Sequence, residues 1–180
     1  MYKNHILIKK KGIKKQYCDN IISIINQSRL VEQKTKNIEG FYSGLFKINP
    51  YEQEWVYDLF AGIEEYKKYN VFLAKGPVAA WKTDVSCNYQ KYKPGQSFNR
   101  EHCEHSISTP YRILVWMIYC NTIKKGGETS FPQQKLKIKP EAGKLVIWPA
   151  GWTHSHIGIA APNENKYIVS GWCSFVEKSI

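Results

Sequence analysis

The chain has 180 residues, with 26 Lys and Arg against 15 Asp and Glu, so its formal net charge is +11. Its length suits one domain with a core of its own, and its apolar and charged fractions, 43% and 23%, are ordinary for a soluble globular protein. Its five cysteines, an odd number without a CxxC pair, argue against a disulfide scaffold and against a structural zinc site.

The N-terminal residues have no apolar stretch typical of a signal peptide, and no run of the sequence reaches transmembrane length. We therefore expect a cytoplasmic protein, in the host cytoplasm if it is viral, without a membrane partner. Residues 1–40 carry nine Lys and Arg against three acidic residues. This cluster favours a solvated lysine-rich face, and the weaker alternative is attraction to nucleic acid or another acidic partner.

The first half of the chain predicts helices. Isoleucines at helical spacing indicate an amphipathic helix over residues 17–30, whereas residues 31–48 are weakly patterned. Asn49-Pro50, followed by Glu52, is typical of a helix start with a capping box. The helix that follows presents apolar side chains at helical spacing, which we interpret as core packing; they are Trp55, Leu59, Ile63 and Tyr66.

From about residue 79 the residue pattern changes to one typical of short strands and turns. The clearest strands cover residues 112–119, 144–148 and 166–175, and Lys124–Gly127 reads as a turn. The predicted fold class is mainly β with N-terminal helices. We expect a single domain over residues 1–180, in which about 1–78 form a helical N-terminal support and about 79–177 form the catalytic β core.

One short segment carries the strongest chemical signal. His102 and Glu104 lie two apart, so on an extended strand their side chains point to the same face. A histidine from a later strand would complete a two-histidine, one-carboxylate face, which suits non-heme Fe(II) with open coordination positions. His154 and His156 are also two apart, and face alone cannot choose between them.

The order of motifs resembles the prolyl 4-hydroxylase-like branch of the 2-oxoglutarate and Fe(II)-dependent dioxygenases, in particular its small phage and bacterial members. The resemblance covers roughly residues 80–176 and implies a double-stranded β-helix, that is, a cupin-like jelly roll, with iron at its open end. The motifs are, in order, Tyr92-Lys-Pro-Gly95, His102-x-Glu104, Gly126-Gly127-Glu128-Thr129, Pro140-x-x-Gly143 to Pro149, His154, Lys166-Tyr167 and Gly171-Trp172.

The resemblance implies that the catalytic metal ligands are His102, Glu104 and a distal histidine. Glu104 stands where similar sequences usually have Asp, and its neighbours Glu101 and His105 are in a less favourable register. For the distal ligand, the spacing from Pro149 favours His154, and the spacing to Lys166 favours the alternative, His156. We expect His154 to bind the metal.

The resemblance also implies a 2-oxoglutarate site. Lys166 would anchor the distal carboxylate of 2-oxoglutarate, and Ser170, on the same face of its strand, could donate to that carboxylate. Tyr119 is expected to bring a hydroxyl to it, and Tyr92 is a candidate for the iron-proximal end. The alternative to a binding role is core packing for both tyrosines. For Lys166 the alternative is a surface position at the edge of a strand.

The predicted function is a dioxygenase of the hydroxylase type, with a prolyl peptide as the favoured substrate and a small molecule as another. It would couple decarboxylation of 2-oxoglutarate to succinate with oxidation of a substrate C–H bond. The implied cofactors are Fe(II), 2-oxoglutarate as cosubstrate and, optionally, ascorbate. The alternatives are a non-redox metal-binding jelly-roll protein and a basic nucleic-acid-binding module.

Overall fold

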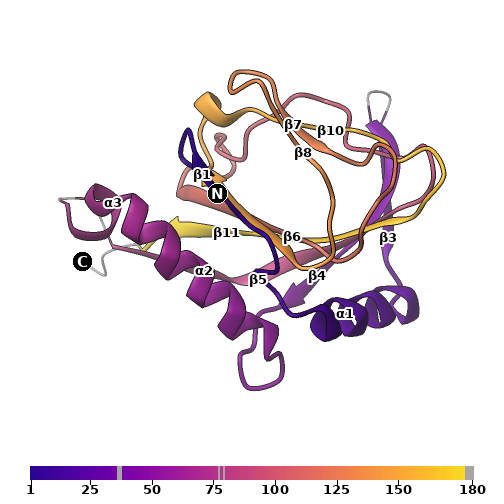
Figure 1. Ribbon diagram of the computed structural model, residues 1–180, viewed down its shortest axis with the longest axis horizontal. Helices are drawn as coiled ribbons and strands as arrows, with labels where there is room; N and C mark the ends of the chain where they lie inside the picture. Colours follow the sequence, from indigo (N-terminus) through magenta and orange to yellow (C-terminus); the bar gives the residue numbers. More distant parts are fainter. Residues whose placement is uncertain (36–37, 77, 79, 177–180) are drawn as a thin grey trace.

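The structure is a computed structural model that describes residues 1–35, 38–76, 78 and 80–176 (Figure 1). In chain order the elements are β1 (Tyr2–Lys3), β2 (Ile6–Lys9), α1 (Lys15–Gln27), β3 (Val31–Thr35), β4 (Ile38–Lys47), α2 (Trp55–Tyr69), α3 (Val71–Lys75), β5 (Trp81–Tyr92), β6 (Arg112–Tyr119), β7 (Thr129–Phe131), β8 (Leu136–Ile138), β9 (Lys144–Pro149), the 3-10 helix η1 (Trp152–His154), β10 (Ile157–Gly158) and β11 (Lys166–Phe175).

Within the described ranges, the strands form two antiparallel sheets. The large sheet has eight strands in the order β1-β2-β9-β6-β11-β5-β4-β3, and the small one has the order β10-β7-β8. The small sheet faces one side of the large sheet, and helices α1 and α2 cover the other side (Figure 1). The protein is therefore mainly β, as expected from the sequence.

Alternation along the central strands divides the core into two layers. On β6, Trp116 and Ile118 belong to the cluster shared with the helices, whereas Val115, Met117 and Tyr119 belong to the cluster between the two sheets. Both faces of this strand are buried, which explains why its sequence reads as a continuous apolar run. The strands β6, β9 and β11 coincide with the segments predicted at 112–119, 144–148 and 166–175.

The helix expected from Asn49-Pro50 begins only at Trp55. Within the described residues 38–76, no capping box forms with Glu52; instead Gln53 bonds Asn49 twice, because its backbone N–H donates to the Asn49 carbonyl at 2.9 Å and its Oε1 accepts from the Asn49 N–H at 3.0 Å. These bonds pair backbone polar groups within a separate turn over residues 49–53, so the helix starts after this turn.

Residues 1–78 contain strands as well as helices, which corrects the purely helical support expected from the sequence. β2 pairs with β9, and β4 pairs with β5, so both extend the sheet that holds the core strands. Their short or mixed patterns give little local signal, and their strand conformation depends on these long-range partners. Among the described residues, none of the helices has the length and apolar character needed to span a membrane.

Candidate metal centre

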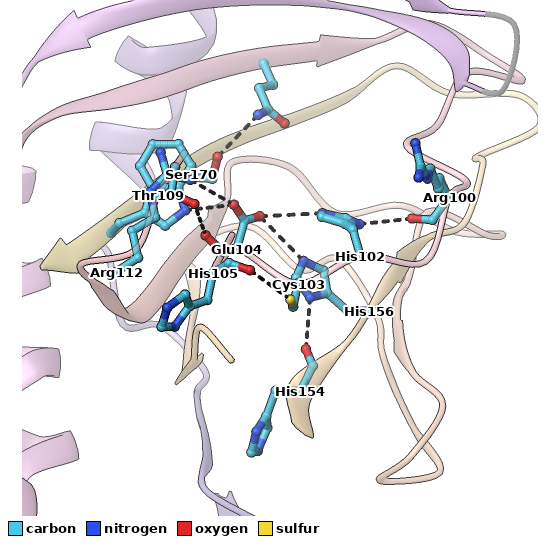
Figure 2. A network of polar contacts seen from close by, with 12 residues as sticks. Arg100, His102, Cys103, Glu104, His105, Thr109, Arg112, His154, His156 and Ser170 are labelled. Atoms are coloured by element: carbon cyan, nitrogen blue, oxygen red, sulfur yellow. Dashed lines mark hydrogen bonds and ion pairs between the residues drawn. The ribbon is translucent and has the colours of Figure 1, made fainter. Parts of the chain in front are cut away.

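A backbone bridge brings the two candidate segments together. The N–H of His102 donates to the carbonyl of His156 at 3.1 Å, and the N–H of His156 donates to the carbonyl of His102 at 2.8 Å. The N–H of Glu104 donates to the Ala150 carbonyl at 3.0 Å, which fixes the other end of the segment. As a result, one ligand atom from each of His102, Glu104 and His156 lies within 4.8 Å of the other two (Figure 2).

The two imidazoles present the same nitrogen to the carboxylate. Nε2 of His102 lies 3.5 Å and Nε2 of His156 lies 3.8 Å from Oε1 of Glu104. Nδ1 of His102 lies 2.9 Å from the Arg100 carbonyl, and Nδ1 of His156 lies 3.1 Å from the His154 carbonyl. Because a carbonyl oxygen only accepts, each Nδ1 carries the hydrogen, and each Nε2 keeps its lone pair for a metal.

The pKa shifts of Glu104 and His156 keep both side chains in the protonation state that binds a metal. Burial alone would favour the neutral acid of Glu104, but its contacts with His102, His156 and Trp172 outweigh burial, so the pKa of this carboxyl lies below its usual value. Burial, together with the neighbouring His102, lowers the pKa of His156 to about 4. At neutral pH the site therefore offers a carboxylate and the neutral His156 ring.

The donor set fits Fe(II). Two imidazole nitrogens and one carboxylate oxygen approach from one side, as in the facial triads of non-heme iron oxygenases, and the other side opens into a cavity of about 220 Å³. All three side chains line this cavity. A metal held by them would keep coordination positions that face the cavity and are accessible to small ligands.

His154, the distal ligand we expected, does not join this group. The strand ends at Pro149, and residues Trp152–His154 form the turn η1, so His154 and His156 do not continue one strand. Nε2 of His154 donates to the Asn4 carbonyl at 2.9 Å, and its Nδ1 lies 3.0 Å from the hydroxyl of Thr153. The ring points away from the three clustered side chains (Figure 2). The spacing to Lys166 was the sequence signal that indicated His156.

The neighbours of the His102–Glu104 segment are also directed elsewhere. Glu101 accepts a hydrogen bond from the Ser155 hydroxyl at 2.6 Å, and His105 is exposed with its ring away from His102 and His156 (Figure 2). Neither residue belongs to the group of clustered ligand atoms.

The strand β11 carries the other charged group of the cavity. Lys166, Ile168, Ser170 and Trp172 alternate along this strand and all line the cavity. The Lys166 side chain is 3% exposed; its Nζ lies 3.4 Å from the Gly127 carbonyl and 4.5 Å from the centre of the Tyr92 ring. Burial lowers the pKa of Lys166 to about 8, a shift that Glu128 partly opposes.

Three of the four expected cosubstrate-binding residues lie in this cavity, namely Lys166, Ser170 and Tyr92. Tyr119 lies behind it, because its buried hydroxyl donates to the Thr129 hydroxyl at 2.6 Å, and Thr129 lines the cavity. Burial raises the pKa of both tyrosines, so both hydroxyls stay protonated at neutral pH.

Gln90 is a cavity residue that the sequence interpretation missed. The Tyr92 hydroxyl donates to its Oε1 at 2.7 Å, and its Nε2 donates to the Ser170 hydroxyl at 3.2 Å. It therefore links two residues of the expected cosubstrate site. The available signal was its position two residues before Tyr92, on the same face of β5.

The second half of the chain matches a known protein family. Residues 87–174 match the family described as the 2OG-Fe(II) oxygenase superfamily. The chain is 26% identical over 92 residues to prolyl 4-hydroxylase subunit alpha-1 of Gallus gallus, a match that covers 46% of this chain and 18% of the chicken protein. The chain thus spans about a fifth of the length of that curated relative.

Two solved structures share the fold over most of their length. A viral collagen prolyl hydroxylase from Paramecium Bursaria Chlorella virus-1, solved as a 2-oxoglutarate complex, superposes with a TM-score of 0.73 at 20% identity and covers 96% of this chain and 97% of its own. A prolyl hydroxylase from Trichoplax adhaerens, solved with a hypoxia inducible factor peptide fragment, gives a TM-score of 0.75 at 12% identity and covers 96% and 84%. Residues 87–174 therefore match the 2OG-Fe(II) oxygenase superfamily, and the chain resembles prolyl 4-hydroxylases.

Proposed function

We propose that this protein is an Fe(II)- and 2-oxoglutarate-dependent hydroxylase that acts on a prolyl peptide. The observation that carries the proposal is the placement of two unlike sites in one cavity. A two-histidine, one-carboxylate group lies at one place in its wall, and the buried ammonium of Lys166 lies at another. A metal ion and a dicarboxylate bound side by side would satisfy both.

The proposed metal ligands are His102, Glu104 and His156. This assignment replaces His154 as the distal ligand, and it is supported by the orientation of the Nε2 atoms of His102 and His156 toward Glu104. Iron bound there would supply the oxidative chemistry of this superfamily, in which 2-oxoglutarate is converted to succinate as a substrate C–H bond is hydroxylated.

Lys166 is proposed to pair with the distal carboxylate of 2-oxoglutarate. Within the described part of the chain Lys166 makes no salt bridge, and a buried ammonium is stabilised by a paired anion. The hydroxyl of Ser170 accepts from Gln90, so its own hydrogen is available to the same ligand, and Tyr92 lines the cavity with its hydroxyl bonded to Gln90. Tyr119 would act through Thr129, whose hydroxyl it holds. The buried side chains of Val115 and Met117 make part of the cavity wall apolar.

The prolyl-peptide substrate is supported by similarity. The chicken relative is a prolyl 4-hydroxylase subunit, and the Trichoplax neighbour was solved with a peptide fragment. We also propose a double-stranded β-helix as the architecture and one domain over residues 1–180, supported by the pairing of β2 and β4 with core strands. The five free cysteines, four of them buried, support a reducing compartment such as the cytoplasm.

Anaerobic titration calorimetry tests the proposal directly. The metal-free protein is titrated with 2-oxoglutarate in the absence and in the presence of Fe(II), and we expect strong binding only with the metal. Succinate release on addition of oxygen is then compared across proline-containing peptides, matched peptides with alanine, and small molecules. Metal binding without any 2-oxoglutarate binding would instead support a non-redox metal-binding protein.

A further inference from the structure

The two oxygens of the Glu104 carboxylate have different partners. Oε1 faces Nε2 of His102 and Nε2 of His156. Oε2 points the other way, where it accepts hydrogen bonds from Nη1 of Arg112 at 3.2 Å and from Nε1 of Trp172 at 3.0 Å (Figure 2). One oxygen is therefore directed to the metal site, and the other is held by the protein.

The side chains of Arg112 and Trp172, which donate to Oε2, also pack against each other. The guanidinium of Arg112 stacks on the indole of Trp172, with its central carbon 3.6 Å from the ring centre. The two residues come from the paired strands β6 and β11. The side chains of Arg112 and Glu104 are 23% and 19% exposed, so this contact is largely shielded from water. Guanidinium and indole N–H groups can only donate hydrogen bonds, so both bind a carboxylate oxygen as their acceptor.

A glutamate ligand needs such support more than an aspartate does. Its additional methylene adds a rotatable bond, so the carboxylate can swing and can also offer both oxygens to one metal ion. We propose that Arg112 and Trp172 form a clamp on Oε2, which positions Glu104 so that it binds the metal through Oε1 alone. Both are positioning residues in this role, and the inference rests on the proposed function because it assigns Glu104 to the metal.

A single-oxygen ligand matters for the cosubstrate. A carboxylate that binds through both oxygens occupies one more coordination position, which 2-oxoglutarate or oxygen then cannot use. The clamp also explains how this chain uses Glu where similar sequences usually have Asp. The shorter side chain cannot reach both the clamp and the metal, so Glu104→Asp is expected to weaken metal binding here.

Two variants remove the clamp in different ways. Trp172→Phe deletes the indole N–H but keeps an aromatic ring beneath Arg112, and Arg112→Met deletes the guanidinium donors but keeps an aliphatic stem. The matched control is Trp152→Phe, because the Trp152 side chain is 75% exposed and lies outside the cluster. Circular dichroism of the metal-free proteins establishes that each variant is folded, and either clamp variant suffices for the test.

The measurement is Co(II) binding to the metal-free protein by calorimetry, with the Co(II) d–d absorption spectrum recorded at saturation. Removing a group that orients a metal ligand typically weakens metal affinity by about 10- to 100-fold. We expect a loss in this range and a changed Co(II) spectrum for each clamp variant, and less than about a twofold change for Trp152→Phe. Equal affinities and spectra in wild type and both clamp variants would overturn the clamp and leave the proposed function intact.

A double-variant cycle isolates the contact itself. If Asp at position 104 does not reach the clamp, then Trp172→Phe has little further effect in the Glu104→Asp background, and the two losses do not multiply. Multiplicative losses would overturn the direct contact. Wild-type protein that binds no Co(II) would overturn both the clamp and the proposed function. Metal binding that depends on the clamp, without 2-oxoglutarate binding, would overturn the function alone.

Discussion

Replacing Lys166 with methionine is expected to stabilise the metal-free protein while abolishing 2-oxoglutarate binding. The Lys166 side chain is 3% exposed, and burial lowers its pKa from 10.5 to about 8. At ~1.4 kcal/mol for each unit of pKa, the folded state carries a cost of about 3 kcal/mol for holding the charged ammonium at neutral pH. Methionine keeps a similar apolar stem without that charge, so the free energy of unfolding should rise by up to about this amount.

Urea denaturation of the metal-free proteins at several pH values measures this effect. Between pH 8 and 10.5 the unfolded chain holds a proton on Lys166 that the folded protein has lost, so the free energy of unfolding of the wild type should rise with pH across this window. Below pH 8 both states hold the proton, and the cost is present in full. In Lys166→Met this rise should be absent.

Lys137→Met is the matched control, because Lys137 is exposed on β8. Its effect should stay within about 0.5 kcal/mol, as for most surface substitutions. A Lys166→Met protein that is less stable than wild type at pH 7 would refute the reasoning that the buried ammonium is a cost. If this variant bound 2-oxoglutarate as tightly as wild type in the presence of metal, Lys166 would not be the anchor.

Three further predictions concern neighbouring parts of the structure. His156→Ala should abolish Fe(II) binding in anaerobic calorimetry, whereas His154→Ala should keep it and lose about 1 kcal/mol of stability with the hydrogen bond to the Asn4 carbonyl; the opposite result would make His154 the ligand. As pH falls from 6.5 to about 4, the free energy of unfolding of the metal-free protein should fall by on the order of 3 kcal/mol, because the unfolded chain protonates His156 before the folded protein does. Urea titrations should show a smaller dependence of this free energy on pH in His156→Gln. An equal dependence in the wild type and the variant would contradict the low pKa of His156. A β-carbon at Gly171 would overlap the buried indole of Trp116, so Gly171→Ala should cost about 1–3 kcal/mol in the same titrations, and an unchanged stability would show that this packing is loose.

The strands that could be predicted are those with a continuous apolar pattern. β6, β9 and β11 are buried on both faces and stand out in the sequence for that reason. β2 and the hairpin of β3 and β4 could not be predicted, because they are short or mixed in pattern and are stabilised by pairing with distant strands. The start of α2 depended on whether Glu52 or Gln53 completed the preceding turn, a choice that local pattern does not decide.

The sequence by itself indicated the chemistry proposed for the site. The spacing of His102 and Glu104 indicated a face for a metal such as Fe(II), and the resemblance to 2-oxoglutarate and Fe(II)-dependent dioxygenases implied 2-oxoglutarate, with Lys166 as its anchor. Only the tertiary structure decided which distal histidine lies beside His102 and Glu104, because that depends on the turn at Trp152–His154 and on the backbone bridge between His102 and His156. It also decided that Arg112 and Trp172, 60 residues apart in the chain, converge on one oxygen of Glu104. Residue identity fixes which ligands are available, whereas contacts between distant segments fix which of them share a point in space.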